Sequence, residues 1–301
     1  MRGPRIITRT LSAAVIVDKH GNPWQYHSRS DHHSKVACWA IAFDLLAASS
    51  KLRYHVAAGR VTFGINRQLN DYETGKKKDL DLVIARAPGH DPAGDAPSKG
   101  KNAARAFDLI ELAERFQVAL TDDDRAALDA LDLPPAPAGK PGATVLVALE
   151  AKACMTAHIA ALPRLHDELT SSHAIVHGDT HSALSVGFVM INTATEFASP
   201  GKNARPLEPG AALDKTQHKQ LHATERTVDM LEDEVRRRSG PQSNQAGFDA
   251  LGLMLVNMAN DGSPVELVTA PPAPKPSSAF HYDQMIDRVA QLYENTYGNL
   301  T

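Results

Sequence analysis

The sequence has few cysteines and no long apolar run, and each absence excludes a class of protein. Its two cysteines, Cys38 and Cys154, lie inside apolar runs and form no C-x-x-C pair. We therefore predict that both are reduced core residues in a reducing compartment, rather than a disulfide or zinc ligands. No window approaches the roughly 18 apolar residues of a membrane span. The apolar run at residues 13–17 is too short for a signal peptide, so we expect a cytoplasmic protein.

The chain also lacks a large net charge. Its 301 residues carry a formal charge of −3, so bulk charge does not indicate a nucleic-acid-binding protein. Any polyanionic partner must therefore be met by a local basic surface. The length is sufficient for the core of an enzyme.

Helical and strand patterns alternate along the first two thirds of the chain. We expect a buried helix at 35–49, strands at 60–65 and 79–86, a strand at 144–153, a helix at 155–172 and a strand at 185–194. The helical crossover between the last two strands predicts that they run parallel.

Residues 87–143 are too long a connection for a compact sheet, so they predict a helical insertion. We divide the chain into an N-terminal arm (1–34), a core (35–200) and a C-terminal extension packed on the core (201–301). In the extension we expect a polar helix at 214–238, strands at 252–258 and 265–270, and an amphipathic helix at 282–297.

The most apolar strand ends in two opposite charges, Glu150 and Lys152, separated by Ala151. Side chains alternate along a strand, so both charges lie on one face and Ala151 on the other. One interpretation is a solvated ion pair at a strand end. The other is a site mounted on the edge of a sheet, because Asp79 and Asp81 begin the preceding strand in the same alternating way.

If these strands are neighbours, an aspartate approaches Glu150. Two close carboxylates repel unless a cation or a proton lies between them, and carboxylate oxygens suit Mg²⁺. A lysine beside such a cation can orient or deprotonate a water, or stabilise charge on phosphorus. We assign the role of cation ligand to Asp81, which adjoins the apolar run directly. If the register differs, Asp79 is the ligand instead.

Asp81 on one strand and the E-A-K tripeptide at 150–152 on the next, in an α-β-β-β-α-β order, resemble the PD-(D/E)xK nuclease superfamily. The resemblance covers about half of the chain, residues 35–194. It implies an α/β fold with a restriction-endonuclease-like core, a central mixed sheet flanked by helices. It also implies that Asp81, Glu150 and the carbonyl of Ala151 bind Mg²⁺, with Mn²⁺ as a substitute, and that Lys152 assists the attacking water.

The activity implied is Mg²⁺-dependent cleavage of DNA, as in type II restriction enzymes or phage-defence (antiviral) nucleases, by a homodimer or higher oligomer. The alternative is a catalytically silent protein of this fold that binds nucleic acid or a regulatory ligand. The chain departs from the family pattern at three places. Leu80 replaces the proline, the spacing from Asp81 to Glu150 is long, and His33 to Lys35 stand where many members carry a helix glutamate.

Several basic residues are further candidates near such a site. The stretch YHSRSDHHSK at 26–35 contains Arg29, His33 and Lys35 just before the first helix. It is a solvated helix start, a DNA contact or rim of the active site, or, with less support from spacing, a zinc site.

Two more groups carry the same ambiguity. Lys76, Lys77 and Lys78 lead into Asp79, and form either a solvated loop or a contact near the cleaved phosphate. His158 lies one turn into the helix after Lys152 and is either an accessory residue of the site or an ordinary helix position.

Overall fold

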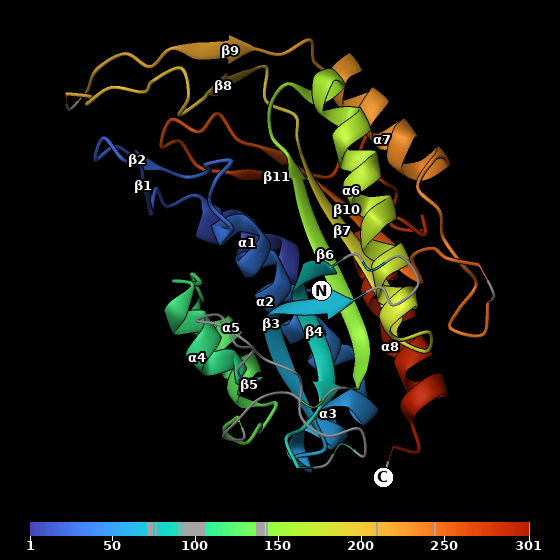
Figure 1. Ribbon diagram of the computed structural model, residues 1–301. Helices are drawn as coiled ribbons and strands as arrows, with labels where there is room; N and C mark the ends of the chain where they lie inside the picture. Colours follow the sequence, from blue (N-terminus) through green and yellow to red (C-terminus); the bar gives the residue numbers. More distant parts are fainter. Residues whose placement is uncertain are drawn as a thin grey trace.

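Strand β6 (Val145–Cys154) lies at the centre of a seven-stranded mixed sheet with the order β11-β10-β7-β6-β4-β3-β5 (Figure 1). The computed structural model describes residues 1–70, 75, 77–89, 91, 106–136, 142, 144–208, 210–243 and 245–300. The other strands of the sheet are β3 (Val61–Asn70), β4 (Lys77–Arg86), β5 (Ala106–Phe107), β7 (Leu184–Asn192), β10 (Ala250–Asn257) and β11 (Glu266–Val268). Strands β6, β7 and β10 are parallel, which confirms the prediction from the helical crossover, whereas β4 is antiparallel to both β6 and β3.

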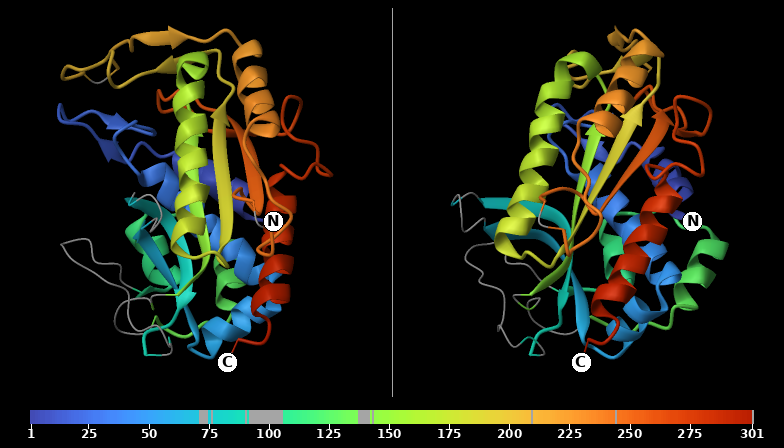
Figure 2. Two further views of the ribbon diagram at one scale, coloured as in Figure 1. Left: turned by 45° about the vertical axis from the view of Figure 1, so that its right-hand side comes forward. Right: turned by 90° about the vertical axis from the view of Figure 1, so that its right-hand side faces the viewer.

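Helices cover both faces of this sheet, giving an α/β fold with three layers (Figure 2). The helices are α1 (Gly3–Leu11), α2 (His32–Ala48), α3 (Ser50–Ala57), α4 (Leu109–Arg115), α5 (Asp122–Asp129), α6 (His158–Asp179), α7 (His222–Asp233) and α8 (Tyr282–Tyr297). Helices α1, α2 and α8 pack together on one face, and α6 and α7 pack on the other. Two small hairpins stand outside the sheet: β1 (Ile16–Val17) with β2 (Pro23–Trp24), and β8 (Glu196–Ala198) with β9 (Lys215–Gln217).

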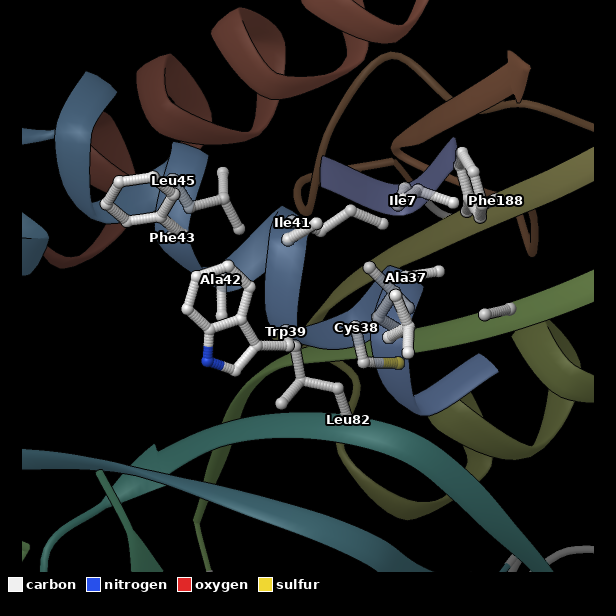
Figure 3. Packing of buried hydrophobic residues seen from close by; sticks show 14 of the residues in the cluster. Ile7, Ala37, Cys38, Trp39, Ile41, Ala42, Phe43, Leu45, Leu82 and Phe188 are labelled. Carbon is white, nitrogen blue, oxygen red and sulfur yellow. The ribbon is translucent and has the colours of Figure 1, made fainter. Parts of the chain in front are cut away.

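Helix α2 is apolar on every side because it is enclosed on every side. It lies between the sheet, α1, α4 and α8, and a helix without a polar face is expected in such a position. Figure 3 shows Trp39 and Phe43 of α2 packed together above Leu82 of β4, and Ile7 of α1 beside Phe188 of β7. The Trp39 indole also donates a hydrogen bond of 2.7 Å to the Leu109 carbonyl, so the inserted segment is tied to this core.

The sequence predicted most of these elements, with differences at their ends. Ser49 caps a separate helix, α3, which the pattern did not distinguish from α2. Strand β3 continues to Asn70, beyond the strand expected at 60–65, because β4 pairs with it as far as that residue. The insertion contains helices α4 and α5 as expected, and in addition β5, which pairs with β3. The polar helix expected at 214–238 is shorter, since β9 takes its first residues.

The C-terminal third of the chain contributes to the same sheet. Strand β10 pairs with β7, β11 pairs with β10, and α8 covers that end of the sheet beside α2. Both cysteines are buried and free, as predicted. Within the described part of the chain, no helix is long and apolar enough to cross a membrane.

Candidate functional site

Strands β4 and β6 separate at the point where the predicted acidic residues begin. Their antiparallel ladder ends at the pair Leu82–Leu149, and the next residues are Asp81 on β4 and Glu150 on β6. Beyond that point β6 remains paired with β7 as far as Cys154. The Asp81 carboxylate bridges the opening by accepting a hydrogen bond of 2.9 Å from the backbone N–H of Ala151. The sheet therefore brings Asp81 to the backbone of Ala151, the residue after Glu150.

The register selects Asp81 rather than Asp79. The side chain of Asp79 is exposed and accepts a hydrogen bond of 3.3 Å from the amide of Gln68 on β3. Asp81 is instead turned toward the N-terminus of α2, where the Ser34 side chain hydrogen-bonds to it. The end of the β4–β6 ladder at Leu82 thus places Asp81, and not Asp79, at the opening between the strands.

Glu150 is buried, with 2% of its surface exposed, and it is the centre of a charged network. Its Oε1 atom lies 2.7 Å from the Lys152 ammonium and 3.2 Å from that of Lys78. Its Oε2 atom is buried and has no hydrogen-bond partner among the described residues. A buried, unpartnered carboxylate oxygen is costly, so a group that binds there would be stabilised.

The two lysines differ in how many of their donors are already used. Lys78 also contacts the Glu168 carbonyl at 2.9 Å and the Ser172 hydroxyl at 2.5 Å, so all three ammonium donors have acceptors. Lys152 contacts Glu150 and, at 3.2 Å, the Oε2 atom of Glu168. Lys78 therefore anchors Glu150, whereas Lys152 retains a donor for a ligand.

The electrostatics of the site follow from burial and from close like charges. Burial, and then the charge of Glu150, raise the pKa of Asp81 to about 6. Burial alone would lower the pKa of Lys152, but the carboxylates of Glu150 and Glu168 outweigh it and the pKa is raised. Lys152 is thus protonated at neutral pH, and it acts as a hydrogen-bond donor and a positive charge rather than as a base.

Asp81, Lys152 and Glu168 line a cavity of about 410 Å³ at the end of the sheet, whereas Glu150 lies behind Lys152 and does not line it. Asp81, Ala151 and Lys152 form its sheet side, and Arg164 and Glu168 of α6 form the opposite side. The Arg164 guanidinium lies 2.6 Å from Glu168 and is 84% exposed, so it stands at the solvent end.

Histidine His33 is the other titratable group of this cavity wall. Burial lowers the pKa of His33 to about 4, so its imidazole is neutral at pH 7. Its ring lies 5.0 Å from that of Tyr26, and its Nδ1 atom is buried without a partner among the described residues.

The other predicted accessory residues lie elsewhere. Lys35 is bound to Asp31 at 2.6 Å and lies over the ring of Phe116 at 5.7 Å, away from the cavity. His158 is buried, with its Nε2 atom 2.8 Å from the Asn192 carbonyl, and it does not line the cavity.

The remaining basic candidates are divided between surface positions and a second cleft. Lys77 is exposed to solvent, and Lys76 lies outside the described residues. Arg29 is exposed and lines a cleft adjoining the cavity.

Sequence reasoning missed Glu168 and the anchoring role of Lys78. A signal for Glu168 was present, since Ala161, Leu165, Glu168 and Ser172 recur at helical spacing on the face of α6 that packs on the sheet. An acid in the middle of an inward-facing stripe indicates a buried ionic partner. Lys78 had no such signal, because its contact depends on how α6 lies across the end of β4.

The donor set suits a hard divalent cation with few protein ligands. Within the described residues, no group of three or more histidine, cysteine, aspartate and glutamate side chains is arranged as a metal site. Mg²⁺, however, commonly uses one or two carboxylates together with waters and phosphate oxygens. Asp81 and Oε2 of Glu150 are candidates for two such ligands. In a strand the carbonyl of a residue points to the same side as its N–H, so the Ala151 carbonyl is the candidate for a third oxygen.

Comparison with family models, curated proteins and solved structures gave no match for this chain.

Proposed function

We propose that this protein is a Mg²⁺-dependent endonuclease that hydrolyses phosphodiester bonds of DNA, of the restriction or phage-defence type. The observation that carries the proposal is the juxtaposition at the strand opening. Asp81 and Glu150 are the first residues beyond the end of the β4–β6 ladder, and Asp81 is bonded to the N–H of Ala151. Glu150 keeps a buried oxygen without a partner among the described residues, and protonated Lys152 lies next to it on the wall of a cavity that Asp81 also lines. A solvated ion pair would require none of this burial.

Asp81, Glu150 and the carbonyl of Ala151 would hold the cation. When bound, Mg²⁺ supplies Lewis-acid polarisation of a phosphoryl oxygen, and Mn²⁺ is expected to replace it. The raised pKa of Asp81 supports this assignment, because a carboxylate that is reluctant to ionise beside another one gains from a cation placed between them.

Lys152 has a role that its protonation state defines. In hydrolysis a water oxygen bonds to phosphorus and the water loses a proton to solvent, while the bond from phosphorus to one ester oxygen breaks and that oxygen takes a proton from solvent. Negative charge grows on the phosphoryl oxygens in between. The Lys152 ammonium, fixed by Glu150 and Glu168, donates a hydrogen bond to the water or to a phosphoryl oxygen without first losing its proton. Arg164 at the solvent end of the cavity adds positive charge where the polyanion enters.

Cleavage of plasmid and linear DNA in Mg²⁺ tests this proposal. Wild type is compared with Glu150→Ala and Lys152→Ala, and with Lys51→Ala as a control that removes an exposed lysine outside the cavity. We expect the first two variants to be slower by about 10²-fold or more, since each removes a group used in the transition state. Equal cleavage by all four proteins would show that the activity belongs to another site or to a contaminant.

A silent binding protein is the second candidate, and one observation favours it. Oε1 of Glu150 already contacts two ammonium groups, Lys78 and Lys152, so the carboxylate is neutralised without a metal. This candidate predicts that wild type binds nucleic acid but cleaves neither DNA nor RNA in Mg²⁺.

One such site cuts one strand, so the endonuclease proposal also includes a homodimer or higher oligomer. Sedimentation with and without DNA tests this part of the proposal.

A further inference from the structure

A second cleft, of about 810 Å³, adjoins the cavity that contains Asp81 and Lys152. Its walls are the β1–β2 hairpin at residues 16–20, the loop at residues 26–31, and the chain from Phe197 to Ala204 after β8. Five residues line both spaces, namely Tyr26, Ser28, Ser30, Asp31 and Thr156. The two spaces are therefore neighbours along one surface.

Two cations, Lys19 and Arg29, and two acids, Asp18 and Asp31, line this cleft, and they differ in how far they are already paired. Lys19 and Arg29 line it, and within the described part of the chain neither forms an ion pair. The carboxylates of both acids already have partners within the protein. Asp18 accepts hydrogen bonds from the Trp24 indole at 2.9 Å and from backbone N–H groups, and Asp31 is bound to Lys35 at 2.6 Å.

Hydroxyl and imidazole side chains complete the lining. The hydroxyl side chains are those of Ser28, Ser30, Thr156 and Ser199, and the histidines are His20 and His27. Lysine, arginine and hydroxyl side chains are the groups that contact phosphate and sugar in protein–DNA complexes. Lys152 and Arg164, each paired with Glu168, supply donors in the adjoining cavity.

Hydrogen bonds from distant parts of the chain fix the walls of the cleft. The buried side chain of Asn22 donates to the Arg205 carbonyl at 2.8 Å and accepts from the Leu207 N–H at 3.0 Å, which ties the β1–β2 hairpin to the segment between β8 and β9. Asn260 accepts from the N–H of Tyr26 and donates to the Ala198 carbonyl, each at 2.8 Å. In Figures 1 and 2 the two hairpins extend from the same side of the molecule, next to one another. The cleft is a built feature, formed before any ligand arrives.

We infer that this cleft binds the sugar–phosphate backbone of DNA adjacent to the bond that is cut, with Lys19 and Arg29 as phosphate contacts. The inference rests on the proposed function, because it extends the path of the substrate from the cavity at Asp81. The contacts recognise charge and backbone rather than bases, so binding through this cleft is independent of sequence and strongly dependent on salt.

Equilibrium binding measured apart from cleavage tests the inference. Fluorescence anisotropy of a labelled DNA duplex, with the full chain in EDTA at several KCl concentrations, compares wild type with the double variant Lys19→Ala/Arg29→Ala. A matched control, Lys51→Ala/Lys275→Ala, removes two exposed lysines that line neither space. Unfolding midpoints of all proteins establish that the variants are folded.

The expected result is a weaker affinity of the Lys19/Arg29 variant and a salt slope reduced by about 1.8, because each phosphate contact contributes about 0.9. The control is expected to keep the wild-type slope. Equal losses in both double variants, or no loss in either, would overturn the inference. Failure of this inference is distinguishable from failure of the proposed function. If wild type binds DNA but does not cleave it, only the proposed nuclease activity is contradicted. If wild type cleaves DNA and the Lys19/Arg29 variant binds it as tightly as wild type, only the role of the cleft is contradicted.

Discussion

Replacing Asp81 with asparagine is predicted to stabilise the protein, and more so as the pH rises. Asp81 has a pKa of about 6 in the folded protein against an ordinary value of 3.8. The folded state therefore binds this proton more tightly than the unfolded state. The stability that Asp81 contributes through this proton is complete below the pKa of the unfolded state, and it is lost as the pH rises toward and through the pKa of the folded state. The variant has no proton to lose, and its side-chain oxygen still accepts from the Ala151 N–H.

The magnitude follows from the shift. A pKa shift of this size lowers the free energy of unfolding of wild type by about 3 kcal/mol between acidic pH and pH 8, and roughly half of this loss has already occurred at pH 5. The advantage of Asp81→Asn over wild type is thus expected to grow by about 1.5 kcal/mol between pH 5 and pH 8. This follows from burial of Asp81 beside Glu150, and not from any loss of a hydrogen bond.

Urea unfolding in EDTA at a series of pH values measures the effect. Asp79→Asn serves as the control, since that side chain is exposed two residues earlier on the same strand, and it is expected to follow wild type at every pH. A free-energy difference between Asp81→Asn and wild type that stays constant from pH 5 to pH 8 would refute the reasoning, because it would mean that Asp81 ionises in the folded protein as easily as in the unfolded one.

Three further predictions concern the charged network. Lys78→Met removes the anchor of Glu150 and should cost about 1–3 kcal/mol in urea unfolding while slowing cleavage; unchanged values for both would exclude the anchoring role. Glu168→Gln removes one of the carboxylates that raise the pKa of Lys152, so the pH at which cleavage is lost on the alkaline side should fall. An unchanged pH limit would show that loss of the Lys152 proton does not cause the alkaline decline. Millimolar Mg²⁺ should raise the thermal midpoint more at pH 8 than at pH 5, because a proton and the cation compete for Asp81; equal shifts at both pH values would argue against that ligand.

The position of Glu150 and Lys152 at the end of a buried strand could be predicted from the sequence alone. The run before Glu150 is apolar on both faces, which indicates a central strand, and the period of two places both charges on one face. The structure bears out the central position, the parallel partner and the shared face.

The choice between Asp79 and Asp81 was harder, because it depends on where the β4–β6 ladder stops. That register includes an irregularity between Ile84 and Ala85, and no sequence pattern specifies it. Lys78 could not be assigned for a similar reason, since its three contacts depend on a long side chain reaching a helix far along the chain.

The hairpins that form the second cleft were not predictable. Strands β1 and β2 have two residues each, and β8 and β9 have three, too short for any alternating pattern to be read. Their positions depend on single side chains such as Asn22 and Asn260, which hydrogen-bond to backbone groups distant in sequence. Buried polar residues of this kind specify tertiary structure without a local signature.

The binding of a divalent cation at Asp81 and Glu150 is the central claim, and calorimetric titration with Mn²⁺ tests it most directly. Wild type and Glu150→Gln are titrated at pH 8, where Asp81 is ionised, in the absence of DNA. The account predicts that wild type binds Mn²⁺ and releases few protons at this pH, and that Glu150→Gln binds it at least about tenfold more weakly. Equal affinity of the two proteins, or no binding by wild type, would contradict the account.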